Sequence, residues 1–211
     1  MMKYVSIAVL CINLIFGTTL HAEGLGYSLG TTLEVPDYDA ARAAFDRRDY
    51  AAAFTAYYPL AEQGNVRAQD MIGMLYSFGW GVPANQKEAA HWYSLAVAQG
   101  SALSAFGLGG MYRDGSGVPK NFEEALRLYR LAAMGGVVGA LDALGTMHRD
   151  GEGVLQDNIT AHMWFNMSGA RGKTASMQAR DKLENRMTPA DISQAQDAAR
   201  TCMSSGYKDC R

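Results

Sequence analysis

The chain has 211 residues, of which 48% are hydrophobic and 19% are charged, and its formal net charge at pH 7 is −2. This balance supports a packed core and is not typical of a disordered protein. The small acidic excess argues against a nucleic-acid partner, because binding to a phosphate backbone needs a basic surface. Alanine and glycine are frequent and only five prolines occur, which favours closely packed helices over a sheet.

The first 22 residues have the three parts of a secretory signal peptide. Lys3 precedes an apolar stretch from Tyr4 to Phe16, and polar and small residues lead on to Ala22. The apolar stretch is shorter than the roughly 20 residues that a membrane-spanning helix needs. We expect cleavage near Ala22 and a mature protein that is periplasmic or secreted, without membrane attachment. An uncleaved anchor is the alternative.

The segment after the predicted signal divides into a lead-in and a first pair of helices. Residues 23–36 are rich in glycine and threonine, so we expect a flexible or extended lead-in. Residues 37–63 contain two alanine-rich runs and are predicted to form an N-terminal helix pair.

Three segments of 36 residues, 64–99, 100–135 and 136–171, align without gaps. Glycines coincide at 73, 109 and 145, at 79, 115 and 151, and at 81, 117 and 153; alanines coincide at 89, 125 and 161. One aromatic position holds Tyr93, Tyr129 and Phe165. So many matches at one spacing predict a repeat protein.

Each repeat is predicted to contain two helices. In the first copy, a helix over 67–77 buries Ile72 and ends at Gly79, where a positive φ costs glycine nothing. The second helix begins at an N-cap, which Asn85, Asn121 and Asp157 supply in turn. Glu88 and Glu124 follow three residues later as a variant of the capping box, whereas the third copy has Thr160 and a weaker start.

The remaining glycines need a separate explanation. Those at 73, 109 and 145 lie inside helices, where each costs about 1 kcal/mol relative to alanine. We expect another helix to cross there, with Ala89, Ala125 and Ala161 as the small partners across the crossing. The glycine pair in each copy is interpreted as a hinge between the two helices of a hairpin.

Residues 172–211 are predicted to end the array. They contain one more first helix, then a polar capping helix that begins with Thr188 as N-cap, Pro189 and Asp191. Cys202 and Cys210 lie in "CMSSGYKDC" and are expected to form a local disulfide in an oxidising compartment. A metal site is the alternative, but it would need further ligands and none lie nearby.

These motifs resemble the Sel-one-like repeat (SLR) family, relatives of the tetratricopeptide repeats. The resemblance covers about residues 39–187, and the third copy departs from the pattern with His148 for tyrosine, Leu155 for proline and Thr160 for glutamate. The matching positions are Ala140-Leu144-Gly145, Gly115-x-Gly117-Val118, Lys87-Glu88-Ala89, Trp92-Tyr93 and Ala132-Ala133. The resemblance implies an all-α, right-handed solenoid of antiparallel helix pairs whose concave groove is lined by the first helices.

Function in such folds is usually the binding of a protein or peptide rather than chemistry. We therefore expect a monomeric scaffold or adaptor. The competing hypothesis is a hydrolase, because β-lactamase activity is attributed to cysteine-rich secreted members; the repeats here contain no cysteine. Self-assembly through the ends of the solenoid is a third hypothesis, against which the polar last helix argues.

Candidate binding residues are those on first helices, or in a turn, that the repeat does not hold constant. Phe106 is the clearest candidate, because the equivalent residues in the other two repeats are Asp70 and Asp142. Its ring either anchors a partner or fills the space left by Gly107. Trp80, in the first Gly-x-Gly turn, is either a contact or packed over the N-terminal helix pair. The full set is Met71, Met74, Phe106, Arg113, Asp142, Thr146, Arg149 and Trp80.

The sequence offers no catalytic, metal or cofactor site. His91, His148 and His162 show no metal-ligand spacing, and no nucleophile is paired with a base. Trp92 and Trp164 occupy constant repeat positions and are expected in the core. We predict no cofactor and no catalytic residues.

Overall fold

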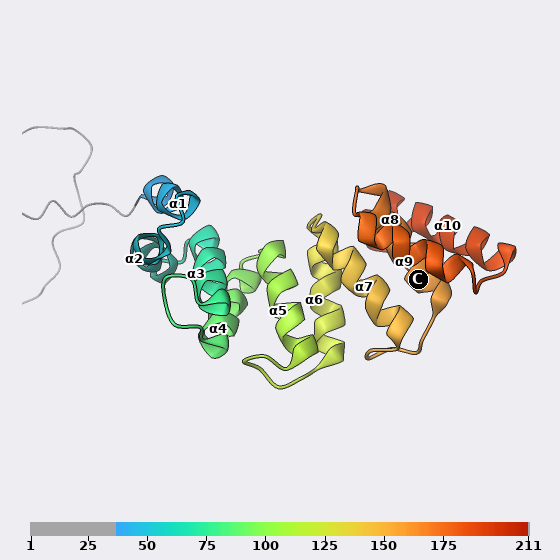
Figure 1. Cartoon of the computed structure of the whole chain (residues 1–211), viewed down its shortest axis with the longest axis horizontal. Helices are drawn as coiled ribbons and strands as arrows, with labels where there is room; N and C mark the ends of the chain where they lie inside the picture. Colours follow the sequence, from blue (N-terminus) through green and yellow to red (C-terminus); the bar gives the residue numbers. More distant parts are fainter. Residues whose placement is uncertain (1–36, 211) are drawn as a thin grey trace, which may run out of the picture. The chain divides into compact units, whose positions relative to one another are not determined.

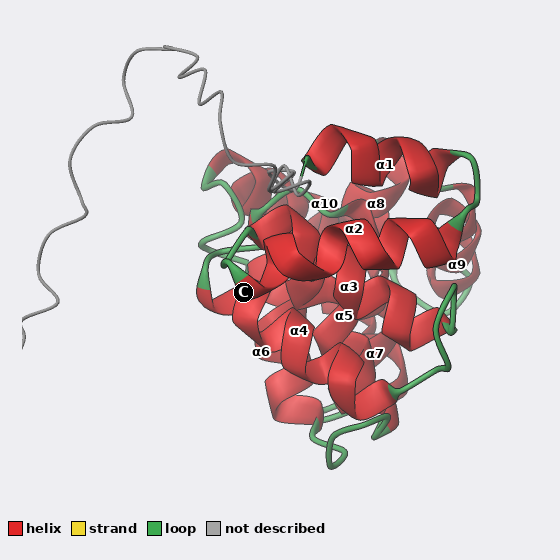
Figure 2. Ribbon diagram, turned by 90° about the vertical axis from the view of Figure 1, so that its left-hand side faces the viewer, coloured by secondary structure: helices red, strands yellow, loops and turns green. Residues whose placement is uncertain are grey.

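The computed structural model describes residues 37–210, so the predicted signal peptide and lead-in lie outside the described residues. Within 37–210 the chain forms helices and loops and no strand (Figures 1 and 2). The helices are α1 (Tyr38–Asp46), α2 (Tyr50–Glu62), α3 (Val66–Phe78), α4 (Gln86–Ala98), α5 (Ala102–Asp114), α6 (Phe122–Met134), α7 (Val138–Asp150), α8 (Asn158–Ala170), α9 (Thr174–Glu184) and α10 (Pro189–Ser204).

The helices follow one another in chain order, and each of α1 to α9 packs mainly on its neighbours in the sequence (Figure 1). The six helices α3 to α8 have 13 residues each, so the 36-residue repeat of the sequence becomes a repeat of helix pairs. The prediction of an all-α solenoid is confirmed.

The helix ends follow the predicted signals. Gly79, Gly115 and Gly151 end α3, α5 and α7 with φ of 69°, 73° and 72°. Asn85 caps α4 by accepting hydrogen bonds from the backbone N–H groups of Lys87 and Glu88, and Asn121 and Asp157 cap α6 and α8 in the same way.

The capping box is completed at the start of α10. There the Thr188 hydroxyl accepts from the Asp191 N–H at 3.2 Å, and the Asp191 carboxylate accepts from the Thr188 N–H at 3.1 Å. Glu124, expected to act similarly on α6, instead accepts hydrogen bonds from the guanidinium of Arg127 at 2.9 and 2.6 Å. In α8 the Thr160 hydroxyl donates to the Asp157 carboxylate at 2.5 Å, which adds a side-chain contact to that helix start.

The mid-helix glycines do face a crossing helix, but the predicted partner was wrong. A Cβ added to Gly73 would lie 2.6 Å from the ring of Tyr93, and one added to Gly145 would lie 2.7 Å from the ring of Phe165. Gly109 faces Tyr129 in the same way, at 2.9 Å. The bulky ring of the second helix, and not the small alanine beside it, therefore fills the space that each glycine leaves.

The second glycine of each turn, which lies between the two helices of a repeat, also makes a contact between repeats. A Cβ on Gly117 would lie 2.2 Å from the backbone oxygen of Gln86, the first residue of α4. A Cβ on Gly81 would lie 2.3 Å from the backbone of Tyr50 at the start of α2, and one on Gly153 would lie 2.5 Å from the Cβ of Phe122 at the start of α6. Each loop thus rests on the first turn of the second helix of the preceding repeat.

The core runs along the array and includes the predicted tryptophans. Trp92 belongs to an N-terminal cluster with residues of α1 to α3, and Trp164 belongs to a larger cluster that extends from α4 to α8 and α10. Both side chains are buried, as expected for constant repeat positions. His148 is also buried, in the position that Tyr76 and Tyr112 hold in the other repeats.

Burial and the charge of Arg130 lower the pKa of His148 below its usual value, and its Nε2 has no hydrogen-bond partner within residues 37–210. The folded protein therefore favours the neutral imidazole, and stability falls as the pH drops through the unfolded value of about 6.5. We expect His148→Tyr to reduce the stability lost between pH 7.5 and 5 in urea unfolding, and His91→Gln, at an exposed histidine, to leave it unchanged. Identical pH profiles for His148→Tyr and the parent would contradict this.

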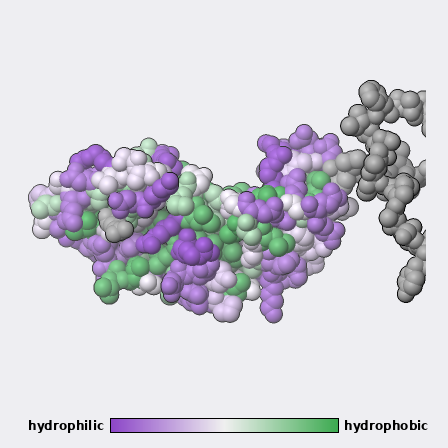
Figure 3. Space-filling view, turned by 180° about the vertical axis from the view of Figure 1, so that it is seen from behind, coloured by the Kyte–Doolittle hydropathy of each residue, from purple (hydrophilic) through white to green (hydrophobic). Residues whose placement is uncertain are grey.

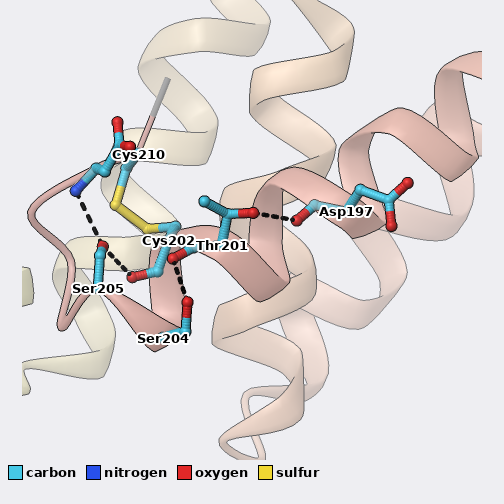
Figure 4. Close-up of a disulfide and its surroundings, with 7 residues drawn as sticks. Asp197, Thr201, Cys202, Ser204, Ser205 and Cys210 are labelled. Carbon is cyan, nitrogen blue, oxygen red and sulfur yellow. Dashed lines mark hydrogen bonds between the residues drawn. A yellow bond between two sulfur atoms is a disulfide. The ribbon is translucent and has the colours of Figure 1, made fainter.

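The C-terminal helix departs from the repeat. Its main partner is α8 rather than α9, so α10 covers the last complete repeat instead of pairing with the final first helix. Cys202 on α10 is buried and forms a disulfide with Cys210, with the Cα atoms 4.5 Å apart. The Ser205 hydroxyl fastens the same loop, donating to the carbonyl of Cys202 and accepting from the N–H of Asp209 (Figure 4).

Candidate functional site

A cavity of about 390 Å³ opens along the first helices α3, α5 and α7. Four of the residues predicted from the sequence line it: Phe106, Arg113, Asp142 and Thr146. They were chosen because the repeat does not hold their positions constant, and the structure brings them to one place.

Three glycines outside the repeat pattern give this cavity its depth. Gly107 and Gly110 on α5 stand where the first repeat has Met71 and Met74, and Gly139 is the second residue of α7. All three line the cavity. The rings of Tyr93 and Phe106 occupy the space beside Gly107 and Gly139, whereas a Cβ at Gly110 would meet only the hydroxyl of Tyr129, at 3.6 Å.

Phe106 forms one wall of the cavity, but not for the reason considered above. The space beside Gly107 is taken by the ring of Tyr93, whose Cε2 would lie 3.1 Å from an added Cβ. Phe106 instead reaches the next repeat, where it packs against Gly139, and its ring centroid lies 5.8 Å from that of Tyr129. The side chain is half-buried, with its remaining surface toward the cavity.

The aspartates equivalent to Phe106 hold consecutive repeats together. The Asp70 carboxylate accepts hydrogen bonds from the hydroxyls of Ser101 and Ser104 at the start of α5. Two repeats further along the chain, Asp142 accepts from the Lys173 ammonium at 2.8 Å and the Ser176 hydroxyl at 2.6 Å. In the repeat between Asp70 and Asp142, the corresponding contact to the next repeat is apolar, because Phe106 packs against Gly139.

The charged groups around the cavity neutralise one another. Arg113 binds the carboxylate of Asp114 through Nε and Nη2 at 2.8 and 3.2 Å, and Lys173 forms an ion pair with Asp142. These four residues all line the cavity. The site consequently presents no unpaired charge to a ligand.

Two tyrosine hydroxyls lie at the floor of the cavity, and sequence reasoning missed them. Tyr93 and Tyr129 are only 8% and 2% exposed, yet both line the cavity. Burial raises the pKa of Tyr93 to about 12 and shifts the pKa of Tyr129 in the same direction, so both phenols stay protonated at neutral pH. Both tyrosines occupy an aromatic position that the repeats share. The sequence criterion selected residues that differ between repeats, so it did not select them.

An aromatic stack borders the cavity on α3. Trp80 stacks on Tyr50 with ring centroids 5.0 Å apart, and Phe78 also stacks on Trp80, at 4.8 Å. Trp80 thus packs over the N-terminal helix pair, the second of the two alternatives for it. Phe78 is the exposed member, at 61%, and lines the cavity; its equivalents, Asp114 and Asp150, would have marked it in the sequence.

The other predicted residues lie elsewhere. Met71 packs against the N-terminal core cluster, and Met74 is half-buried on α3. Arg149 pairs with Asp150 and lines a second cavity, of about 500 Å³, together with residues of α9. The structure therefore divides the predicted set into a central group of four and a dispersed remainder.

Apolar surface is exposed over part of the molecule. In the face drawn in Figure 3, apolar residues appear mostly toward the middle, and hydrophilic residues dominate both ends.

None of the helices within 37–210 has the length and apolar character needed to cross a membrane.

Comparison with known proteins identifies relatives. A family model described as the Sel1 repeat matches residues 66–101, 102–137 and 139–173. The crystal structure of a Sel1 repeat protein from Oxalobacter formigenes is 25% identical with a TM-score of 0.66, over 81% of this chain and 78% of that chain.

A second structure is similar in fold. The protective antigen of uropathogenic Escherichia coli strains, described as displaying an SLR fold, is 24% identical with a TM-score of 0.55. The match covers 74% of this chain but only 42% of the antigen. No curated protein sequence matches the chain. The three matched repeats account for half of its length, and the chain belongs to the Sel1 repeat family.

Proposed function

We propose that this protein is a monomeric, non-catalytic scaffold that binds a segment of a partner protein along α3, α5 and α7. The observation that carries the proposal is the cavity at the central repeat, where residues that depart from the repeat come together beside Gly107 and Gly110 of α5. Repeat arrays of this kind serve mainly as binding surfaces, which supports the same conclusion.

We place this function in the periplasm or outside the cell. Residues 1–22 read as a cleavable signal peptide. The pairing of Cys202 with Cys210 suits an oxidising compartment, because structural disulfides are rare in a reducing cytosol.

Site-specific photo-crosslinking in the native envelope tests the proposal. A photo-reactive residue at position 106 lies in the cavity, and one at position 155 lies on an exposed loop that does not line it. We expect one recurrent protein adduct at 106 and none at 155. Equal labelling at both positions, or no adduct at 106 from folded and abundant protein, would reject the groove as the site. Turnover of nitrocefin by purified protein would favour the hydrolase instead.

Phe106→Ala is expected to weaken partner binding without unfolding the array. The ring is half-buried, so we expect a stability cost of about 2 kcal/mol, below the roughly 3–5 kcal/mol of a fully buried phenylalanine. Leu103→Ala is the matched control, because Leu103 lies on the same helix, is 58% exposed and does not line the cavity. Circular dichroism reports folding and adduct yield reports binding. Loss of the helical signal in Phe106→Ala would show that the residue is core.

A further inference from the structure

The cavity contains hydrogen-bond donors that the protein itself leaves unused. The hydroxyls of Tyr93 and Tyr129 have no hydrogen-bond acceptor among residues 37–210, although both side chains are more than nine-tenths buried. Neither hydroxyl oxygen is among the fully buried side-chain atoms that lack a partner, so both are accessible and available to a ligand in the cavity.

The hydroxyl ends of both rings lie beside glycines that line the cavity. The Cζ atom of Tyr93 would lie 3.1 Å from a Cβ at Gly107, and the Oη of Tyr129 would lie 3.6 Å from a Cβ at Gly110. Because Gly107 and Gly110 line the cavity, the glycines open the path by which the two hydroxyls reach it. The two rings hold the same position in successive repeats, so their hydroxyls are presented from parallel helices one repeat apart.

The same position differs on either side of this pair. Phe165, one repeat later, has no hydroxyl, and the hydroxyl of Tyr57, one repeat earlier, is enclosed and does not line the cavity. The donors are therefore confined to the place where the surface is hollowed.

The remaining groups define what fits between them. The charges of Arg113, Asp114, Asp142 and Lys173 are already paired, so a charged side chain would enter without a counter-ion and lose hydration. Phe106 and Phe78 add apolar walls. An extended peptide suits this arrangement, because it presents backbone carbonyls at regular intervals and an uncharged side chain between them.

We infer that the cavity receives an uncharged, apolar side chain of an extended peptide, whose backbone carbonyls accept hydrogen bonds from the Tyr93 and Tyr129 hydroxyls. This inference rests on the proposed function and specifies the chemistry of the partner. It distinguishes the site from one that captures an acidic tail through unpaired basic groups.

Selection from a phage-displayed library of random decapeptides on the purified, oxidised protein tests it. We expect the enriched peptides to share an uncharged apolar residue and to bind with little dependence on salt. Tyr93→Phe and Tyr129→Phe should each weaken binding of such a peptide about fivefold, the effect of one lost hydrogen bond. The unfolding midpoint should not fall in either variant, since neither hydroxyl has an intramolecular acceptor.

Tyr57→Phe is the matched control, because it removes a hydroxyl from the same repeat position outside the cavity and should leave binding unchanged. Enrichment of acidic or basic peptides with salt-dependent affinity, equal effects of all three variants, or no enrichment at all would overturn the inference. An envelope adduct at position 106 that survives both Tyr93→Phe and Tyr129→Phe unchanged would refute this chemistry while leaving the scaffold function in place. Absence of both adduct and peptide would remove the function as well.

Discussion

Gly117→Ala is expected to lower the free energy of unfolding by about 3 kcal/mol, at the upper end of ordinary single substitutions. The added methyl group would lie 2.2 Å from the carbonyl oxygen and 2.4 Å from the carbonyl carbon of Gln86. These are backbone atoms at the first turn of α4, so no side-chain rotation relieves the contact. The loop after α5 has to move away from the preceding repeat, and a left-handed φ of 73° adds its own strain.

Gly100→Ala separates the two contributions. Gly100 has φ of 90° and nothing within 4 Å of an added Cβ, so only the backbone strain applies, at about 1 kcal/mol. Urea unfolding of the two variants measures the difference, and hydrogen exchange should show the Gly117 variant opening between α4 and α5. Equal destabilisation of the two variants would mean that the close approach of the loop does not contribute to stability.

Reduction of the disulfide between Cys202 and Cys210 is expected to cost about 2.5 kcal/mol, the chain-entropy value for so short a loop. The effect should be concentrated in α10, which buries only Ala195, Ala199 and Cys202 and is held mainly against α8. Amide exchange in α10 should therefore accelerate in reductant, well before α4 to α7 are affected.

The double variant Cys202→Ala/Cys210→Ala provides the control for this experiment. Without sulfur atoms it should exchange as fast as the reduced protein and should not respond to reductant. Alanine is preferred to serine because position 202 is fully buried and a hydroxyl there would add a polar burial cost. Unchanged protection of α10 in the reduced protein would show that packing on α8 holds the helix without the cross-link.

Features encoded by a few neighbouring residues were predictable from the sequence. The helix expected over 67–77 spans Val66–Phe78 and ends at Gly79. The capping residues Asn85 and Thr188 act as expected because a cap depends on residues within one turn. The repeat spacing then fixes the order of the helix pairs.

Features that depend on side-chain direction across an interface were not predictable in the same way. Spacing placed a crossing at Gly145, but it did not distinguish the ring of Phe165 from the methyl of Ala161 as the nearest group. The placement of α10 on α8 depends on a contact between elements that are not adjacent in the chain.

The residues of the candidate site likewise include some that the sequence predicted and some that it did not. Phe106 was found because one repeat differs from its neighbours, whereas Tyr93 belongs to the constant framework. Tyr93 reaches the cavity beside Gly107 of the next repeat, and this contact between two repeats is visible only in the folded structure.

The side-chain contacts of Asp70 and Phe106 with the following repeats make the order of the repeats specific. Deletion of residues 100–135 would keep the 36-residue register but would set Asp70 against Val137 and Ala140, which offer its carboxylate no hydroxyl. Deletion of 136–171 would set Phe106 against Ala175 where Gly139 now gives it room. Although the units share one backbone plan, they are not interchangeable, and this array cannot be shortened or shuffled by recombination between its own copies without a mismatched joint.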